Sequence, residues 1–194
     1  MNGMKRPACR VAAIVLGVWL VAFAVAVGHD RAQAQATLHG LTFPQRIAGT
    51  EIAGTHSFED KNPGLGYSVE YRLAGWKIDV YIYDLRQTSI PDDAMSDAVK
   101  GQLRQATQDI FKAGYGNVAP RLKYAILDDG TRVRFLCQSF GYTHKTLGKV
   151  DSYLCVTAFN RKFVKFRMTT GVRAGSESVA NRFVQAWTKV LWPR

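Results

Sequence analysis

Two cysteines are the residues whose type and position most clearly predict a covalent bond. Cys137 and Cys155 lie within residues 131–170, a stretch that reads as three antiparallel strands joined by two turns. A turn centred near Thr146 would place them opposite each other, where Cβ atoms of paired strand residues approach the distance that a disulfide needs. Two buried free thiols are the alternative. A redox-active pair is not indicated, because the C-x-x-C spacing is missing.

Charge divides the chain into two unequal parts. Residues 121–194 carry 14 Lys and Arg against 4 Asp and Glu, whereas residues 37–120 carry 8 against 10. Such an excess of cations favours an anionic partner, which would be an acidic protein or an anionic envelope component. Nucleic acid is a poor partner for this chain, because no stacking aromatic residues alternate with the charges. An ordinary solvated surface is the alternative interpretation.

Five of these cations form the candidate anion-binding set. Arg134, Lys165 and Arg167 occupy strand positions opposite the apolar alternation, so they are expected to line up across neighbouring strands. Like charges that face one another are unfavourable, and an anionic partner would relieve their repulsion. Arg161 and Lys162, adjacent residues shortly before Lys165, complete the set.

Catalytic and metal-binding patterns have little support. His56, Glu59 and Asp60 are a weak candidate for a metal site, because zinc needs at least three converging ligands and no second histidine lies nearby. The chain has no G-x-S-x-G, H-E-x-x-H or P-loop motif. We therefore expect no cofactor and no metal, and a protein that is not an enzyme.

The N-terminus has the three parts of a secretory signal. Basic residues precede an unbroken apolar run over residues 11–27, and the small-residue segment that follows allows cleavage after Ala34 or Ala36. An uncleaved anchor is the alternative, because a run of this length just spans a bilayer. The prediction is a leader over residues 1–36, a single domain over residues 37–194, and a bacterial periplasmic or secreted protein exported by the Sec route.

Alternation and helical spacing predict the elements of the domain. A strand pair with Tyr81 and Tyr83 on one face is followed by an amphipathic helix, with Pro91 as its first residue, and Tyr81 and Tyr83 are expected to lie beneath a helix. A platform for sugar or peptide is the alternative for the two tyrosines. The expected elements are strands at 67–73 and 76–85, a helix at 90–114, a strand at 121–127, the three strands of 131–170, and a helix at 176–192.

This order predicts an α+β fold, in which an antiparallel sheet of about six to seven strands is packed by two main helices. It resembles the PsbP-like α/β/α fold, which also occurs in small exported bacterial proteins of the DcrB type. The resemblance covers most of residues 58–192 and depends on the order of elements and on a few residues. These are Asn62-Pro63-Gly64 leading into Tyr67-Ser68-Val69-Glu70-Tyr71, the middle helix, the three-stranded stretch, and the last helix with Trp187.

The functional expectation combines these observations. The leader, the basic C-terminal half and the absence of paired catalytic residues predict a non-enzymatic exported protein that binds an anionic or protein partner. The alternative is a small-ligand carrier or weak hydrolase, whose pocket lies between the helix of residues 90–114 and the sheet. A membrane contact is expected only through an uncleaved leader.

Overall fold

The computed structural model describes residues 36–38 and 40–193, which belong to one compact unit, Gln33–Arg194. The predicted leader lies outside the described residues, apart from Ala36. The elements of the described residues are, in chain order, β1 Ala36–Leu38, β2 Leu41–Phe43, β3 Arg46–Ile47, β4 Thr50–Ser57, β5 Tyr67–Leu73, β6 Trp76–Tyr83, α1 Asp97–Lys112, β7 Gly116–Asp128, β8 Arg132–His144, β9 Gly148–Phe159, β10 Lys162–Gly171 and α2 Ser176–Leu191.

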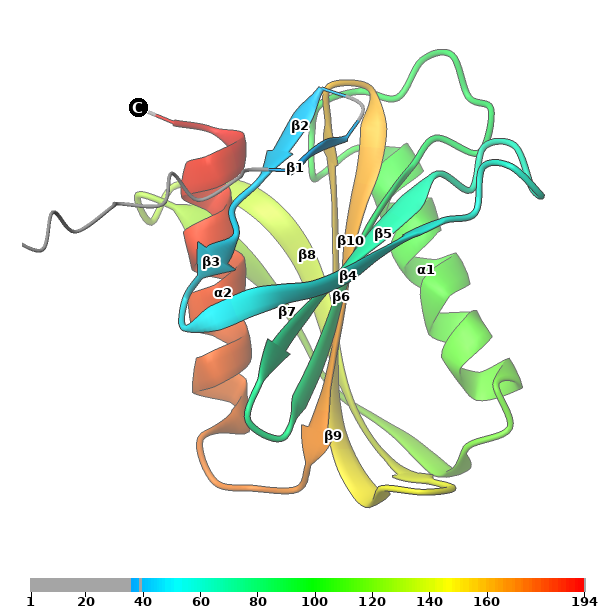
Figure 1. Cartoon of the computed structure of the whole chain (residues 1–194), viewed down its shortest axis with the longest axis vertical. Coiled ribbons are helices and arrows are strands. Elements are labelled where there is room, and N and C mark those ends of the chain that lie inside the picture. Colours follow the sequence, from blue (N-terminus) through cyan, green and yellow to red (C-terminus); the bar gives the residue numbers. More distant parts are fainter. Residues whose placement is uncertain (1–35, 39, 194) are drawn as a thin grey trace, which may run out of the picture. The chain divides into compact units, whose positions relative to one another are not determined.

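Eight strands form one antiparallel sheet, with the order β3-β4-β5-β6-β10-β9-β8-β7. Figure 1 shows α1 on one face of this sheet and α2 on the other. The α+β class and the two packed helices are therefore as predicted. The sheet has eight strands because the segment before β5 adds β3 and β4 to its edge. A separate two-stranded sheet pairs β1 with β2.

The α2 face of the sheet holds the larger part of the core. Trp187 of α2 is fully buried and lies 5.6 Å from Phe166 of β10, centroid to centroid. Phe183, one helical turn earlier, also contacts Phe166 with its ring edge. Burial of such aromatic side chains supplies a large share of the free energy of folding. The helix predicted over residues 176–192 is confirmed, ending at Leu191.

The cysteines are joined as their spacing predicts. Cys137 of β8 and Cys155 of β9 are directly opposed in the strand register and form a disulfide. Both are buried on the α2 face, where they belong to the same core cluster as Trp187. No helix among residues 36–38 and 40–193 is long and apolar enough to cross a membrane.

The first helix starts later than predicted. We expected Pro91 to be its first residue, but α1 begins at Asp97, and the Ser96 hydroxyl accepts a hydrogen bond from the Val99 amide. A serine side chain that satisfies an unpaired amide is a stronger start signal than the fixed φ of proline. Val99, Ala106 and Ile110 then bury one stripe of α1 against the sheet.

Candidate anion-binding site

The five predicted cations do not form one stripe. Arg134 pairs with Asp128, at 3.0 Å between Nη2 and Oδ2, and its guanidinium lies 4.4 Å from the ring centroid of Trp192. Strand β9 separates Arg134 on β8 from Lys165 and Arg167 on β10. The expected alignment across neighbouring strands is therefore wrong, because β8 and β10 are not neighbours.

The turn between β9 and β10 uses two more of the predicted residues. Lys162 pairs with Asp84, with 3.0 Å between Nζ and Oδ2. Arg161 has a left-handed backbone, with a φ of 57°, and its amide donates to the Asp92 carboxylate. These interactions connect the turn to the segment that follows β6, so Arg161 and Lys162 are not brought to the same place as Lys165 and Arg167.

Lys165 and Arg167 are the two predicted cations that the structure brings together. They are alternate residues of β10, so their side chains leave the sheet on the same face, the one that α1 covers. The Lys165 ammonium lies 4.6 Å from the ring centroid of Tyr81 and 5.2 Å from that of Tyr83. Among the described residues, it forms no ion pair with a carboxylate.

The tyrosine rings hold the Lys165 ammonium without neutralising it. Burial raises the pKa of Tyr81 to about 12, so this ring is uncharged at neutral pH and attracts the cation through its π electrons alone. Tyr83 is buried and Tyr81 is partly buried beneath α1, which agrees with the expectation that a helix covers them. Burial also lowers the pKa of the Lys165 ammonium from its ordinary value.

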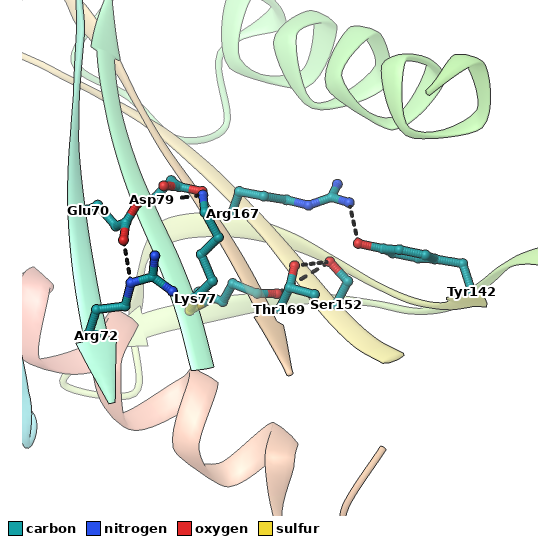
Figure 2. Close-up of polar contacts among 9 residues, drawn as sticks. Glu70, Arg72, Lys77, Asp79, Tyr142, Ser152, Arg167 and Thr169 are labelled. Carbon is teal, nitrogen blue, oxygen red and sulfur yellow. Dashed lines mark hydrogen bonds and ion pairs between the residues drawn. The ribbon is translucent and has the colours of Figure 1, made fainter. Parts of the chain in front are cut away.

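Arg167 is oriented by a tyrosine and not by a carboxylate. Figure 2 shows its guanidinium donating to the Tyr142 hydroxyl of β8, at 3.0 Å from Nη2. Burial alone would raise the pKa of Tyr142, but the charge of Arg167 and hydrogen bonds from Thr169, Arg167 and Ser152 outweigh it and lower the pKa. The contact fixes the direction of the guanidinium and leaves its positive charge uncompensated.

Two nearby carboxylates are already neutralised. Asp79 of β6 is the register partner of Arg167, yet its carboxylate accepts a short hydrogen bond from Lys77. Glu70 of β5, the register partner of Asp79, forms a short ion pair with Arg72, and Figure 2 draws both pairs together with Arg167. The carboxylates of Asp79 and Glu70 are therefore held by other cations, and Arg167 has no ion pair among the described residues.

A cavity of about 190 Å³ lies between α1 and the sheet, and both cations line it. Its volume corresponds to roughly six water molecules at ~30 Å³ each, so it accommodates a small ligand or the end group of a larger one. The lining residues are Tyr81, Ala106, Asp109, Ile110, Ala113, Tyr115, Leu154, Lys165 and Arg167.

The weak metal candidate does not gather ligands. The Glu59 carboxylate accepts hydrogen bonds from the amides of Gly64 and Gly66, and the His56 ring packs edge-on against Phe58. Within residues 36–38 and 40–193, no group of three or more His, Cys, Asp and Glu side chains is arranged to hold a metal ion. His56 thus lies near the end of β4, and Glu59 and Asp60 lie in the loop that follows, where the Glu59 carboxylate stabilises backbone amides.

Sequence reasoning did not find Asp109, Tyr115 or Tyr142. Asp109 lies outside the apolar stripe of α1, where a charged residue normally faces water. Tyr142 shares its face of β8 with Phe140, so its spacing alone indicates a core residue. The alternation of β10 was the available signal, because it places Lys165 and Arg167 on the face to which α1 also packs.

Comparisons with known proteins concern the fold. No protein-family model matches the chain, and no curated protein is significantly similar to it. The fold is similar to the solution structure of cyanobacterial PsbP (CyanoP) from Synechocystis sp. PCC 6803, with a TM-score of 0.45 and 16% sequence identity, over 73% of this chain and 85% of that one.

Proposed function

We propose that this chain is an exported, non-enzymatic binding protein that holds the anionic group of a ligand between α1 and the sheet. One observation carries the proposal: Lys165 and Arg167 line a single cavity, and neither forms an ion pair among the described residues. Of the other three predicted cations, Arg134 and Lys162 form ion pairs with carboxylates, and Arg161 lies in a turn away from the cavity. The proposed site therefore joins two hypotheses from the sequence. One is that cations of the C-terminal half bind an anion, and the other is that a carrier's pocket lies between the first helix and the sheet.

Electrostatics favour an anion at this position. A partly buried ammonium has lost part of its hydration, and tyrosine rings return only a small part of that free energy. An entering carboxylate or phosphate oxygen would accept charge-assisted hydrogen bonds from Lys165 and Arg167. Because burial lowers the pKa of Lys165, a bound anion would raise that pKa again. Binding is therefore linked to protonation of the lysine.

The same lining argues against a hydrolase. Hydrolysis through a covalent intermediate needs an activated nucleophile with an adjacent base. The cavity is lined by no serine, cysteine or histidine among the described residues, so it does not assemble a serine or cysteine nucleophile with a histidine base. The anionic group would belong to a free small molecule, an envelope component or an acidic protein, and the cavity volume suits a group of a few atoms in each case.

The compartment is part of the proposal. Disulfides such as Cys137–Cys155 persist in oxidising compartments, which supports export by the predicted leader. Cleavage after Ala34 would leave β1 complete, whereas cleavage after Ala36 would remove the first residue of that strand. We therefore favour processing after Ala34, and the intact mass of the exported protein would distinguish the two sites.

Titration calorimetry at low salt tests the proposed site, with propionate and inorganic phosphate as probes. Lys165→Met keeps the length of the side chain and removes its charge. One charge-assisted hydrogen bond contributes about 1.5–3 kcal/mol, so affinity for the better probe should fall about 10- to 100-fold. Lys189→Met is the matched control, because Lys189 is exposed on α2, on the opposite face of the sheet.

The controls also define failure. Equal losses in the Lys165 and Lys189 variants would show that net charge, and not the cavity, attracts the probe. The proposal is wrong if neither probe binds the unmodified protein at low ionic strength, where screening is weakest.

A further inference from the structure

The cavity beneath α1 contains charges of both signs. Asp109 of α1 lines it together with Lys165 and Arg167 of β10. The Asp109 carboxylate accepts one hydrogen bond, from Gln105 Nε2 at 2.9 Å, and among the described residues it forms no ion pair. Two cations and one anion therefore share a small cavity without contacting each other.

The walls between these charges are uncharged. Ala106, Ile110 and Ala113 face the cavity from α1 and the residues after it, and Leu154 faces it from β9. Tyr115 adds an aromatic ring, which stacks on Tyr142 with a centroid distance of 4.3 Å. A ligand would thus meet cations on the sheet, an anion on the helix, and an apolar surface between them.

We propose, resting on the function proposed above, that the ligand is a small zwitterion of the amino-acid type. Its carboxylate binds Lys165 and Arg167, its ammonium binds Asp109, and its side chain lies against the apolar walls. Each charge of the ligand meets an opposite charge, and the partly buried charges of Lys165 and Arg167 gain the anionic partner that they lack.

Other small anions fit this arrangement less well. A dianion such as phosphate or a dicarboxylate would bring its second negative charge toward Asp109, which repels it. A simple monocarboxylate would satisfy Lys165 and Arg167 but would offer no cation to the Asp109 carboxylate, so it would lack one charge-assisted interaction. The volume of about 190 Å³ suits a molecule with few heavy atoms, such as alanine with six.

Four probes that differ by one group test this inference by calorimetry on the full chain at low salt. They are L-alanine, propionate (alanine without its ammonium), ethylamine (alanine without its carboxylate) and inorganic phosphate. We expect L-alanine to bind roughly tenfold more tightly than propionate, the gain of one charge-assisted interaction. Phosphate should bind more weakly than L-alanine, and ethylamine should give no measurable heat.

Asp109→Asn separates the two halves of the site. It should remove the advantage of L-alanine over propionate, and should leave propionate binding unchanged or stronger because a repulsive charge is gone. Asp97→Asn is the matched control, because Asp97 is an exposed carboxylate in the first turn of the same helix and does not line the cavity. The control should keep the L-alanine preference.

The outcomes distinguish this inference from the proposed function. Equal affinities of the unmodified protein for L-alanine and propionate would overturn the zwitterion and leave the anion site standing. Tighter binding of phosphate than of L-alanine would do the same, and would indicate that Asp109 only balances Lys165. If propionate, phosphate and L-alanine all fail to bind, both proposals are wrong. The comparison of probes on the unmodified protein remains decisive even if Asp109→Asn does not fold.

Discussion

Removing the disulfide should destabilise the fold by a calculable amount. Cys137 and Cys155 are separated by 18 residues, and closing a loop of this length lowers the entropy of the unfolded chain. The loop-entropy relation converts this separation into about 3 kcal/mol at 25 °C. For a chain of this size, that corresponds to a fall in Tm of about 6–12 °C. Both cysteines are buried, so alanine also leaves a small cavity at each position.

A double-mutant cycle separates the bridge from the cavities. Cys137→Ala, Cys155→Ala and the double variant all lose the bridge, so urea denaturation should give three similar losses in the free energy of unfolding. The sum of the single losses should therefore exceed the loss in the double variant by about 3 kcal/mol. The pair lies on the α2 face, so propionate affinity of the folded double variant should match that of the unmodified protein.

Additive single losses would refute this reasoning, because independent thiols have no shared constraint to lose. Alkylation without reductant provides the second check, since neither Cys137 nor Cys155 should be labelled in the folded or the unfolded state. Labelling of both residues in urea before any reductant is added would show that the bridge does not form.

Three further predictions concern the first turn of α1, a glycine with a left-handed backbone, and the pH dependence of binding. Ser96→Ala should cost about 1 kcal/mol in urea denaturation, because the amide of Val99 loses its acceptor; no change would mean that α1 does not depend on this cap. Gly66→Ala should destabilise by roughly 1–3 kcal/mol, because Gly66 has a φ of 61° and an added Cβ would meet the backbone oxygen of Ile82. Gly54→Ala is its control, since an added Cβ there contacts nothing within 4 Å. Propionate affinity should hold at neutral pH and decline as the pH rises through the lowered pKa of Lys165, below its ordinary 10.5. Lys165→Arg should keep its affinity over that range, because arginine stays charged, and a parallel decline in both proteins would assign the titration to another group.

The sign of the pH effect follows from the direction of the shift. Burial lowers the pKa of Lys165, the charge of Asp109 raises it, and that of Arg167 lowers it, with burial the largest cause. The folded protein therefore releases this proton at a lower pH than the unfolded chain does. The contribution of Lys165 to stability is unfavourable at neutral pH, and improves between its folded and unfolded pKa values.

Much of the fold could be predicted from local patterns. Alternation indicated the strands that became β5, β6, β8, β9 and β10, and helical spacing indicated both helices. The strand predicted over residues 121–127 lies within β7. Strand β4 was missed because it is largely exposed and carries a bulge between Ile52 and Gly54, which interrupts the alternation that marks a half-buried strand. It becomes a strand by pairing with β5, and that pairing could not be predicted from the residue pattern of the segment itself.

The site was predictable only in part. The alternation of β10 placed Lys165 and Arg167 on one face, and both line the cavity. The grouping of these residues with Arg134 was wrong because it assumed a strand order. Asp109 could not be found, because a charged residue on the outer side of a helical stripe normally faces solvent.

The sequence by itself determined the α+β class, the opposed cysteines and the cationic half, because each depends on residue type or on short-range periodicity; the export signal stays a prediction from the same kind of pattern. The tertiary structure alone decided that β9 separates β8 from β10, that Lys77 and Arg72 neutralise the acidic groups beside Arg167, and that Asp109 faces the same cavity as Lys165. The physical reason is that a charge acts over a few ångströms. Which charges come that close depends on strand order and helix placement, and these are set by burial of the whole core.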